Sequence, residues 1–300
     1  MSVLSLDPIL SRRAEVQRIA EGSLRRRQRR SRIALALCVA CILVALVPLV
    51  AVVAYTVERG AQSWSVDFFA HLPTPAGISG GGIWNSIVGS LIIDAIAAAA
   101  AVPLGFLIGL FLAQADGRIA GGIRFAADVL SGVPSITVGI FAYGVLVTTL
   151  HHFSAIAGSF GIGLIMLPVI IRSSETAIRT VPVDLSEAAL SLGAKNATIA
   201  RRVVLPAALP GLVTGMLLAV ARGAGESAPL LFTAIGSQYL TLSPFQPMAA
   251  MPLTIYLDGI QAFSDLQRVA WGTGLLLVVI VLLLSITSRL VTSRLGRTRR

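Results

Sequence analysis

The chain has 300 residues, of which 55% are hydrophobic and only 13% are charged. Soluble domains usually carry about a quarter charged residues, so the composition excludes an ordinary soluble protein and indicates an integral membrane protein. The formal net charge of +10 could suit a nucleic-acid-binding protein, but the basic residues flank apolar runs and do not form one patch. We therefore expect membrane lipid around this chain and no nucleic acid as a partner.

Six apolar runs are long enough to cross a bilayer, which takes about 20 apolar residues in a helix. In chain order they are residues 33–57, 86–113, 123–150, 154–178, 208–236 and 270–291. The first run is too long for a cleaved signal peptide and starts too far into the chain. The sequence thus predicts an all-α, polytopic fold with six transmembrane helices.

The distribution of arginine and lysine predicts the orientation of these spans. Nine basic residues lie in 1–32, two in 114–124, five in 172–202 and five from Arg289 onward. These 21 of the 24 basic residues fall on one side of the six predicted spans. The positive-inside rule places that side, and with it both termini, in the cytoplasm. We expect a basic cytoplasmic tail, 1–32, followed by a six-span transmembrane domain, 33–300.

Residues that could hold a metal or catalyse a reaction are sparse. Cys38 and Cys41 form a C-x-x-C, but no histidine or carboxylate is nearby in this lipid-spanning run, so we interpret them as small apolar side chains. His151 and His152 lie in a predicted loop, where we expect them to cap a connection. The sequence has no G-x4-G-K-[ST] nucleotide loop and no nucleophile–base set. We expect no metal, no cofactor and no enzymatic activity in this chain.

The longest internal connection, between the fourth and fifth spans, is predicted to form two short cytoplasmic helices. Asp184 and Glu187 have the spacing of a capping box at a helix start. Gly193 is placed to end the first helix. Asn196 is expected to cap the second helix, and Pro206 is expected to break it.

This loop, residues 182–206, carries the pattern E-A-A-x3-G followed by L-P. The matching residues are Glu187, Ala188, Ala189, Gly193, Leu205 and Pro206. Together with six spans, the pattern resembles the signature loop of the inner-membrane permease subunits of bacterial ATP-binding-cassette (ABC) importers. The resemblance implies a MetI-like permease domain in the bacterial cytoplasmic (inner) membrane. It also implies that the loop is a coupling segment, which docks on a separate ATP-hydrolysing subunit.

Two opposite charges, Arg222 and Glu226, lie inside the fifth apolar run. At i and i+4 they would be neighbours on one helix face. One interpretation is a self-neutralising ion pair that fixes helix packing, since a lone charge at bilayer depth costs at least about 2.5 kcal/mol. The other is a polar site on a translocation path, because the planar fork of arginine donates paired hydrogen bonds to an oxyanion.

A narrower resemblance is carried by residues 128–144, 166–182, 221–231 and 251–256. These stretches are similar to the PstA-type permeases of phosphate-uptake ABC importers. The resemblance implies a path for inorganic phosphate that includes Arg222, Glu226 and, at the cytoplasmic end of the fourth span, Arg172. For Arg172, a role as a positively charged anchor at a helix end is equally open. Asp94 and Asp128 also lie near or within spans. Either could pair with an arginine, but we expect them mainly to form hydrogen bonds at helix ends or in the interior.

The same resemblance implies three kinds of partner. They are a second related permease (PstC-type), a homodimeric ATPase (PstB-type) and an extracytoplasmic phosphate-binding protein (PstS-type). Two other functions stay open at this point. The chain could be an ABC permease for another oxyanion, such as molybdate, sulfate or phosphonate, or a non-transporting membrane scaffold or sensor subunit.

Overall fold

The computed structural model describes residues 7–78 and 80–297. The first six residues of the predicted tail, 1–32, lie outside these residues. Within the described residues every regular element is helical, apart from one isolated bridge between Ile235 and Met248. The all-α prediction is confirmed. The chain divides into two compact units, after Tyr55, and each is described by itself.

The first unit, in its described part, is the portion of one long helix up to Tyr55. Helix α1 (Asp7–Ala61) has 55 residues, which extend over about 80 Å at 1.5 Å per residue. It continues through residues 32 and 33 without a break, so the predicted tail and the first span belong to one helix. Pro48 lies inside it, where neighbouring groups must satisfy the carbonyl that loses its partner.

Helices of the second unit supply the other spans. Helices long and apolar enough to cross a membrane are α3 (Trp84–Gln114), α7 (Ala155–Arg179), Asn196–Gly223, which ends in α10 (Leu205–Gly223), and α13 (Ser264–Arg297). With α1 they make five, and a sixth span results if one bent pair of helices is counted. Shorter helices are α2 (Val66–Ala70), α8 (Val183–Ser191), α9 (Asn196–Ile199), α11 (Ala228–Thr233) and α12 (Met251–Gly259).

The predicted third span, 123–150, is not one straight helix. It is a bent pair: α4 (Arg118–Gly132), then α5 (Ser135–Ala142), the π-helix Tyr143–Val147 and α6 (Thr148–Leu150), with an angle of 103° at the break. Pro134 causes the break, because a proline has no N–H and pushes the residue before it into an extended conformation. Val133 has that conformation, with φ −70° and ψ 131°.

The core of the second unit lies where α3, α7 and α10 pack together. Ile93, Ile162, Met166 and Ile170 are almost fully buried there. The helices approach closely because glycine faces the contact: a Cβ at Gly109 would lie 2.6 Å from the Ser174 Cβ. Close approach of two helices at a glycine is typical of interfaces between membrane helices, which are rich in small residues.

The predicted fifth span, 208–236, is wrong at both ends. Its helix begins earlier, because α9 continues through a π-helix (Ala200–Val204) directly into α10. Pro206 therefore lies in the first turn of α10 and does not break the helix. Proline is tolerated in the first turn of an α-helix, because an N–H at that position has no carbonyl partner within the helix. The helix ends at Gly223, well before residue 236.

The loop between α7 and α10 forms two short helices, as predicted, but its caps differ from the prediction. Helix α8 starts after Pro182 without a side-chain cap, so the capping box of Asp184 and Glu187 is wrong. Asn196 lies inside α9 and does not cap it. Gly193 ends α8 as predicted: its φ is +78°, its N–H binds the Leu190 carbonyl at 2.9 Å, and the next N–H binds the Ala189 carbonyl at 3.1 Å. This is a Schellman motif, which favours glycine.

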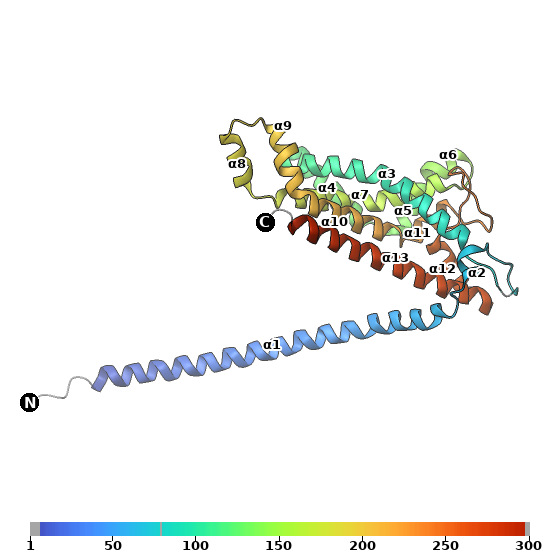
Figure 1. The fold of residues 1–300 in the computed structure, drawn as a ribbon. Coiled ribbons are helices and arrows are strands. Elements are labelled where there is room, and N and C mark those ends of the chain that lie inside the picture. Colours follow the sequence, from blue (N-terminus) through green and yellow to red (C-terminus); the bar gives the residue numbers. More distant parts are fainter. Residues whose placement is uncertain (1–6, 79, 298–300) are drawn as a thin grey trace, which may run out of the picture. The chain divides into compact units, whose positions relative to one another are not determined.

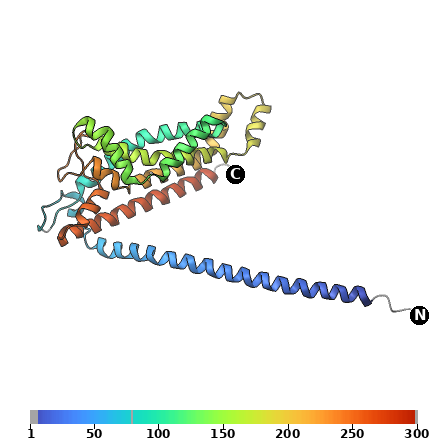
Figure 2. The ribbon, with the colours of Figure 1, turned by 180° about the vertical axis from the view of Figure 1, so that it is seen from behind.

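The two ends of the second unit carry different elements. Figure 1 shows α8 and α9 at one end, and α2, α6 and α12 at the opposite end. The view from behind in Figure 2 shows the same separation. The loop that resembles a coupling segment thus lies at the end of the unit where α7 finishes and α10 starts.

Candidate functional site

Arg222 and Glu226 do not share a helix face, contrary to the prediction. Helix α10 ends at Gly223, and the chain turns there: the Gly225 N–H binds the Arg222 carbonyl at 3.2 Å. The glycines at 223 and 225 favour this turn because they lower helix propensity. Arg222 is exposed and Glu226 is half-buried. Within the described residues, neither side chain takes part in an ion pair, so of the two interpretations the self-neutralising pair is wrong.

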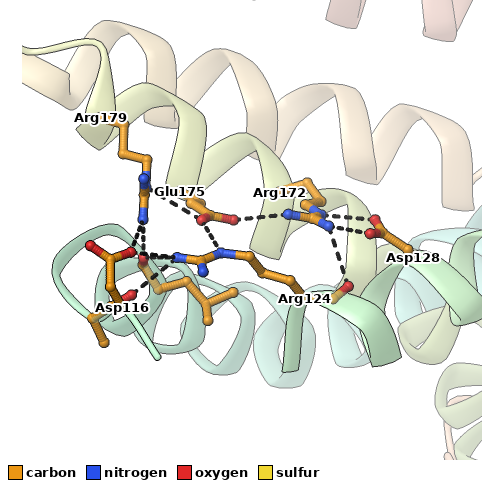
Figure 3. A network of polar contacts seen from close by, with 8 residues as sticks. Asp116, Arg124, Asp128, Arg172, Glu175 and Arg179 are labelled. Atoms are coloured by element: carbon orange, nitrogen blue, oxygen red, sulfur yellow. Dashed lines mark hydrogen bonds and ion pairs between the residues drawn. The ribbon is translucent and has the colours of Figure 1, made fainter. Parts of the chain in front are cut away.

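Arg172 is part of a cluster of six charged residues, which we call the Arg172 cluster (Figure 3). It contains three arginines and three carboxylates, so their formal charges cancel. They come from the α3–α4 connection, from α4 and from α7: Asp116, Arg124, Asp128, Arg172, Glu175 and Arg179. The interpretation of Arg172 as a simple anchor at a helix end does not account for this arrangement.

Glu175 is the centre of the cluster and was missed in the sequence. Its side chain is only 7% exposed, yet it contacts all three arginines. Its carboxylate lies 2.6 Å from Arg124 Nε, 3.1 Å from Arg172 Nη1 and 3.4 Å from Arg179 Nε. A buried carboxylate needs such partners, because an unpaired buried charge is strongly unfavourable. A signal was present: Glu175 lies three residues after Arg172 and four before Arg179, which places all three on one helical face.

Two of the arginines also bind the end of α3. Arg124 Nη2 donates to the carbonyls of Leu112 at 2.7 Å and Ala115 at 3.1 Å, and Arg179 Nη2 donates to Leu112 at 3.0 Å. The last carbonyls of a helix lack partners within it, and positive charge is favourable at that end. The cluster therefore joins the end of α3 to α4 and α7.

Arg172 reaches from α7 to α4. Its Nε donates to Asp128 Oδ1 at 3.0 Å and its Nη2 donates to Asp128 Oδ2, which is a bidentate pair. Its Nη2 also donates to the Arg124 carbonyl at 3.3 Å. Of the two roles open to Asp128, the structure shows the pairing with an arginine and not the expected helix-end or interior hydrogen bonding alone. This pair is more open than Glu175: the side chains of Arg172 and Asp128 are 35% and 61% exposed.

An open cavity of about 640 Å³ lies between α7 and α10, and Arg172 forms part of its wall. Small residues and hydroxyl groups line much of the rest, namely Ser173, Thr176, Thr180, Gly211, Thr214 and Gly215. The Ser173 and Thr180 hydroxyls donate to the carbonyls of Ile170 at 3.2 Å and Thr176 at 2.7 Å. The one positively charged group on this wall is Arg172, among the described residues.

The residues of the coupling pattern lie at the α8–α9 end of the second unit. Glu187 and Ala188 are exposed on α8, and Ala189 is half-buried. Leu205 and Pro206 start α10 and are half-buried. Helix α8 also exposes apolar side chains: Val183 is 67% exposed and Leu192, at its end, is 89% exposed. Such an apolar surface on a short projecting helix indicates contact with another protein.

These features define a class: a helical protein with several helices long and apolar enough to span a membrane, a charged cluster between α4 and α7, and a pair of short helices, α8 and α9, at one end. Residues 101–300 match the family described as binding-protein-dependent transport system inner membrane component. The chain belongs to this family, and within it to the PstA-type permeases, as its relatives show. It is therefore a multi-pass permease subunit of the inner membrane and not an enzyme.

Three relatives carry this assignment. The phosphate transport system permease protein PstA of Yersinia pestis is 36% identical over 89% of this chain and 92% of its own length. The protein of the same name from Haemophilus influenzae is 37% identical over 78% of this chain and 83% of its own length. PstA 1 of Mycobacterium tuberculosis is 36% identical over 73% of this chain and 72% of its own length.

A solved structure shows the same fold. The inward-facing MetNI methionine ABC transporter matches with a TM-score of 0.55 at 21% identity, over 71% of this chain and 94% of that chain. The MetI-like fold expected from the sequence is thus confirmed.

Proposed function

We propose that this chain is the permease subunit of an ABC importer that translocates inorganic phosphate across the cytoplasmic membrane. The observation that carries the proposal is the identity of 36–37% to PstA permeases over most of both chains. The charges of the site agree with it, because guanidinium groups bind oxyanions bidentately and keep their charge at every relevant pH.

A permease of this family works with an ATP-hydrolysing partner and a substrate-binding partner. In our proposal the ATPase is a PstB-type homodimer, and it binds α8 and the residues around Gly193. The α8–α9 end would then face the cytoplasm, as would both termini. A PstS-type phosphate-binding protein would deliver phosphate at the opposite end, and a PstC-type permease would complete the path.

The proposed path includes Arg172, Arg222 and Glu226. Arg222 is exposed in the single subunit, and an exposed arginine at membrane depth is unfavourable unless it faces water or protein. A path between two permease subunits would supply both. Glu226 lies beyond the end of α10 and does not neutralise Arg222, so the arginine is open to an anion in this conformation.

The test is uptake of radiolabelled phosphate into proteoliposomes that contain the two permeases and the ATPase. Phosphate-binding protein and ATP are supplied, and omission of ATP is the control. We expect ATP-dependent uptake that unlabelled phosphate competes away and that sulfate, molybdate and phosphonate do not. Competition by one of those anions alone would assign the permease to that oxyanion. A complete lack of uptake with intact assembly would favour a scaffold or sensor subunit.

A further inference from the structure

The bidentate fork of Arg172 is occupied in this structure by a carboxylate of the chain itself. We propose that Asp128 is an internal substitute for the transported oxyanion: it holds the fork when no anion is present, and a passing phosphate displaces it. This inference rests on the proposed function, because it concerns the regulation of the same path.

The geometry of the fork supports an exchange of one oxyanion for another. Arg172 offers Nε and Nη2 side by side to the two oxygens of Asp128. Two oxygens of a tetrahedral phosphate fit the same pair of donors. The third donor group, Nη1, remains bound to Glu175 at 3.1 Å. Glu175 would thus keep the guanidinium in place while its other partner changes.

Burial distinguishes the partner that can leave from the partner that stays. The Asp128 side chain is 61% exposed, whereas that of Glu175 is 7% exposed. An exposed ion pair contributes little to stability, because water solvates each partner well after separation. A buried carboxylate that loses its partner is left uncompensated. Asp128 is therefore the exchangeable partner of Arg172, and Glu175 is the permanent one.

The surroundings provide both space and a way to move Asp128. The Asp128 side of the fork is accessible, because the Asp128 side chain is 61% exposed. Arg172 also forms part of the wall of the 640 Å³ cavity between α7 and α10, although Asp128 itself does not line that cavity. Asp128 lies in the last turns of α4, close to the 103° bend that follows Gly132. A change at this bend would move Asp128 relative to α7 and would open or close the fork.

The experiment measures equilibrium binding of radiolabelled phosphate to the purified transporter, with both permeases and the ATPase but without binding protein. We expect Asp128→Asn to lower the apparent Kd for phosphate about three- to fivefold. This factor corresponds to the interaction free energy of a partly exposed ion pair. The reason is that phosphate no longer competes with a carboxylate for Arg172. Adding Arg172→Gln to Asp128→Asn should raise the Kd to the wild-type value or above.

Asp116→Asn is the matched control. It removes one carboxylate from the same cluster, and Asp116 pairs with Arg124 and Arg179 but not with Arg172. Its Kd should equal that of the wild type, which separates release of Arg172 from a general gain of positive charge. Assembly and basal ATP hydrolysis of each variant show that it has folded.

Three results would overturn the inference: an unchanged Kd in Asp128→Asn, an equal decrease in Asp116→Asn, or no saturable binding by Asp128→Asn at millimolar phosphate. Uptake by the wild-type transporter with its binding protein is measured on the same preparation. If the wild type imports phosphate but Asp128→Asn binds it no better, only this inference fails. If the wild type imports none, the proposed function fails.

Discussion

Arg172 and Arg222 both lie on membrane-spanning helices of one chain, and their surroundings are opposite. Arg172 contacts two carboxylates and a backbone carbonyl from α4 and α7. Arg222, at the end of α10, is exposed, and no ion pair to it occurs within the described residues. One guanidinium is held in a fixed position by neighbours, and the other is open to whatever lies beside the subunit.

The difference shows that sequence spacing alone does not determine which charges pair. Arg222 and Glu226 have i,i+4 spacing, yet the helix ends between them. Arg172 and Asp128 are 44 residues apart and form a bidentate pair. Pairing depends on where a helix ends and on which helices pack together, and both depend on glycine and proline positions as much as on charge.

The largest effect is expected from Glu175→Gln, which removes the buried charge that three arginines share. The amide can still accept a hydrogen bond, but it leaves three guanidinium groups close together without a central counter-charge. Breaking a buried pair in this way costs about 3–5 kcal/mol. We expect a clear decrease in the thermal unfolding midpoint of the purified transporter.

Asp116→Asn is the control for that experiment. The Asp116 side chain is 87% exposed, so its loss should change stability by no more than about 0.5 kcal/mol. If both variants shift the midpoint equally, the cluster is a general surface network and Glu175 is not its centre.

A second prediction concerns Arg222, which is exposed, in contrast to the paired Arg172. Arg222→Lys keeps the charge but loses the planar fork, so we expect phosphate uptake to fall about tenfold while assembly stays intact. Arg118→Lys is a matched control, because Arg118 is exposed at the start of α4 and is not a member of the Arg172 cluster. Normal uptake by Arg222→Lys would show that only a positive charge, or no contact at all, is needed there.

The sequence predicted the elements that depend on local composition. Apolar runs of sufficient length located most of the spans, although the third is bent and the fifth has other bounds. The 103° bend at Pro134 was not anticipated, because the apolar run 123–150 continues through it. Gly193 marked the end of α8, because the φ of +78° at that position favours glycine. These features need no knowledge of distant contacts.

The Arg172 cluster could not be predicted in the same way. Its centre, Glu175, lies in an apolar helix where one carboxylate among several arginines looks like an ordinary charged turn. Arg124 reaches it only because α4 packs on α7 after the turn at Gly117, whose φ is +120°. The two caps that the sequence misassigned, at Asp184 and Asn196, failed for a related reason. Proline at 182 and the continuous helix into α10 set the helix ends instead.

The smallest effect on stability is expected from a change at Asp258, a carboxylate whose surroundings differ from those of Glu175. Glu175 is buried among arginines, whereas Asp258 on α12 is partly buried beside Thr254 and Leu257 in a second cavity, of about 480 Å³. Burial raises the pKa of Asp258 from its ordinary value of 3.8 to about 6. Helix α12 is not among the candidate membrane spans.

The direction of the resulting pH dependence follows from that shift. The folded state holds the proton more tightly than the unfolded state, so the wild type loses stability as pH rises from about 3.8 to about 6 and then levels off. The full shift would correspond to about 3 kcal/mol, but Asp258 is partly exposed and screened, so we expect about 1 kcal/mol or less. Asp258→Asn should therefore raise the unfolding midpoint at pH 7–8 and leave it unchanged below about pH 4. A midpoint that rises equally at both pH values would show that the aspartate destabilises the fold by its shape, because a carboxyl protonated in both states has no charge left to desolvate.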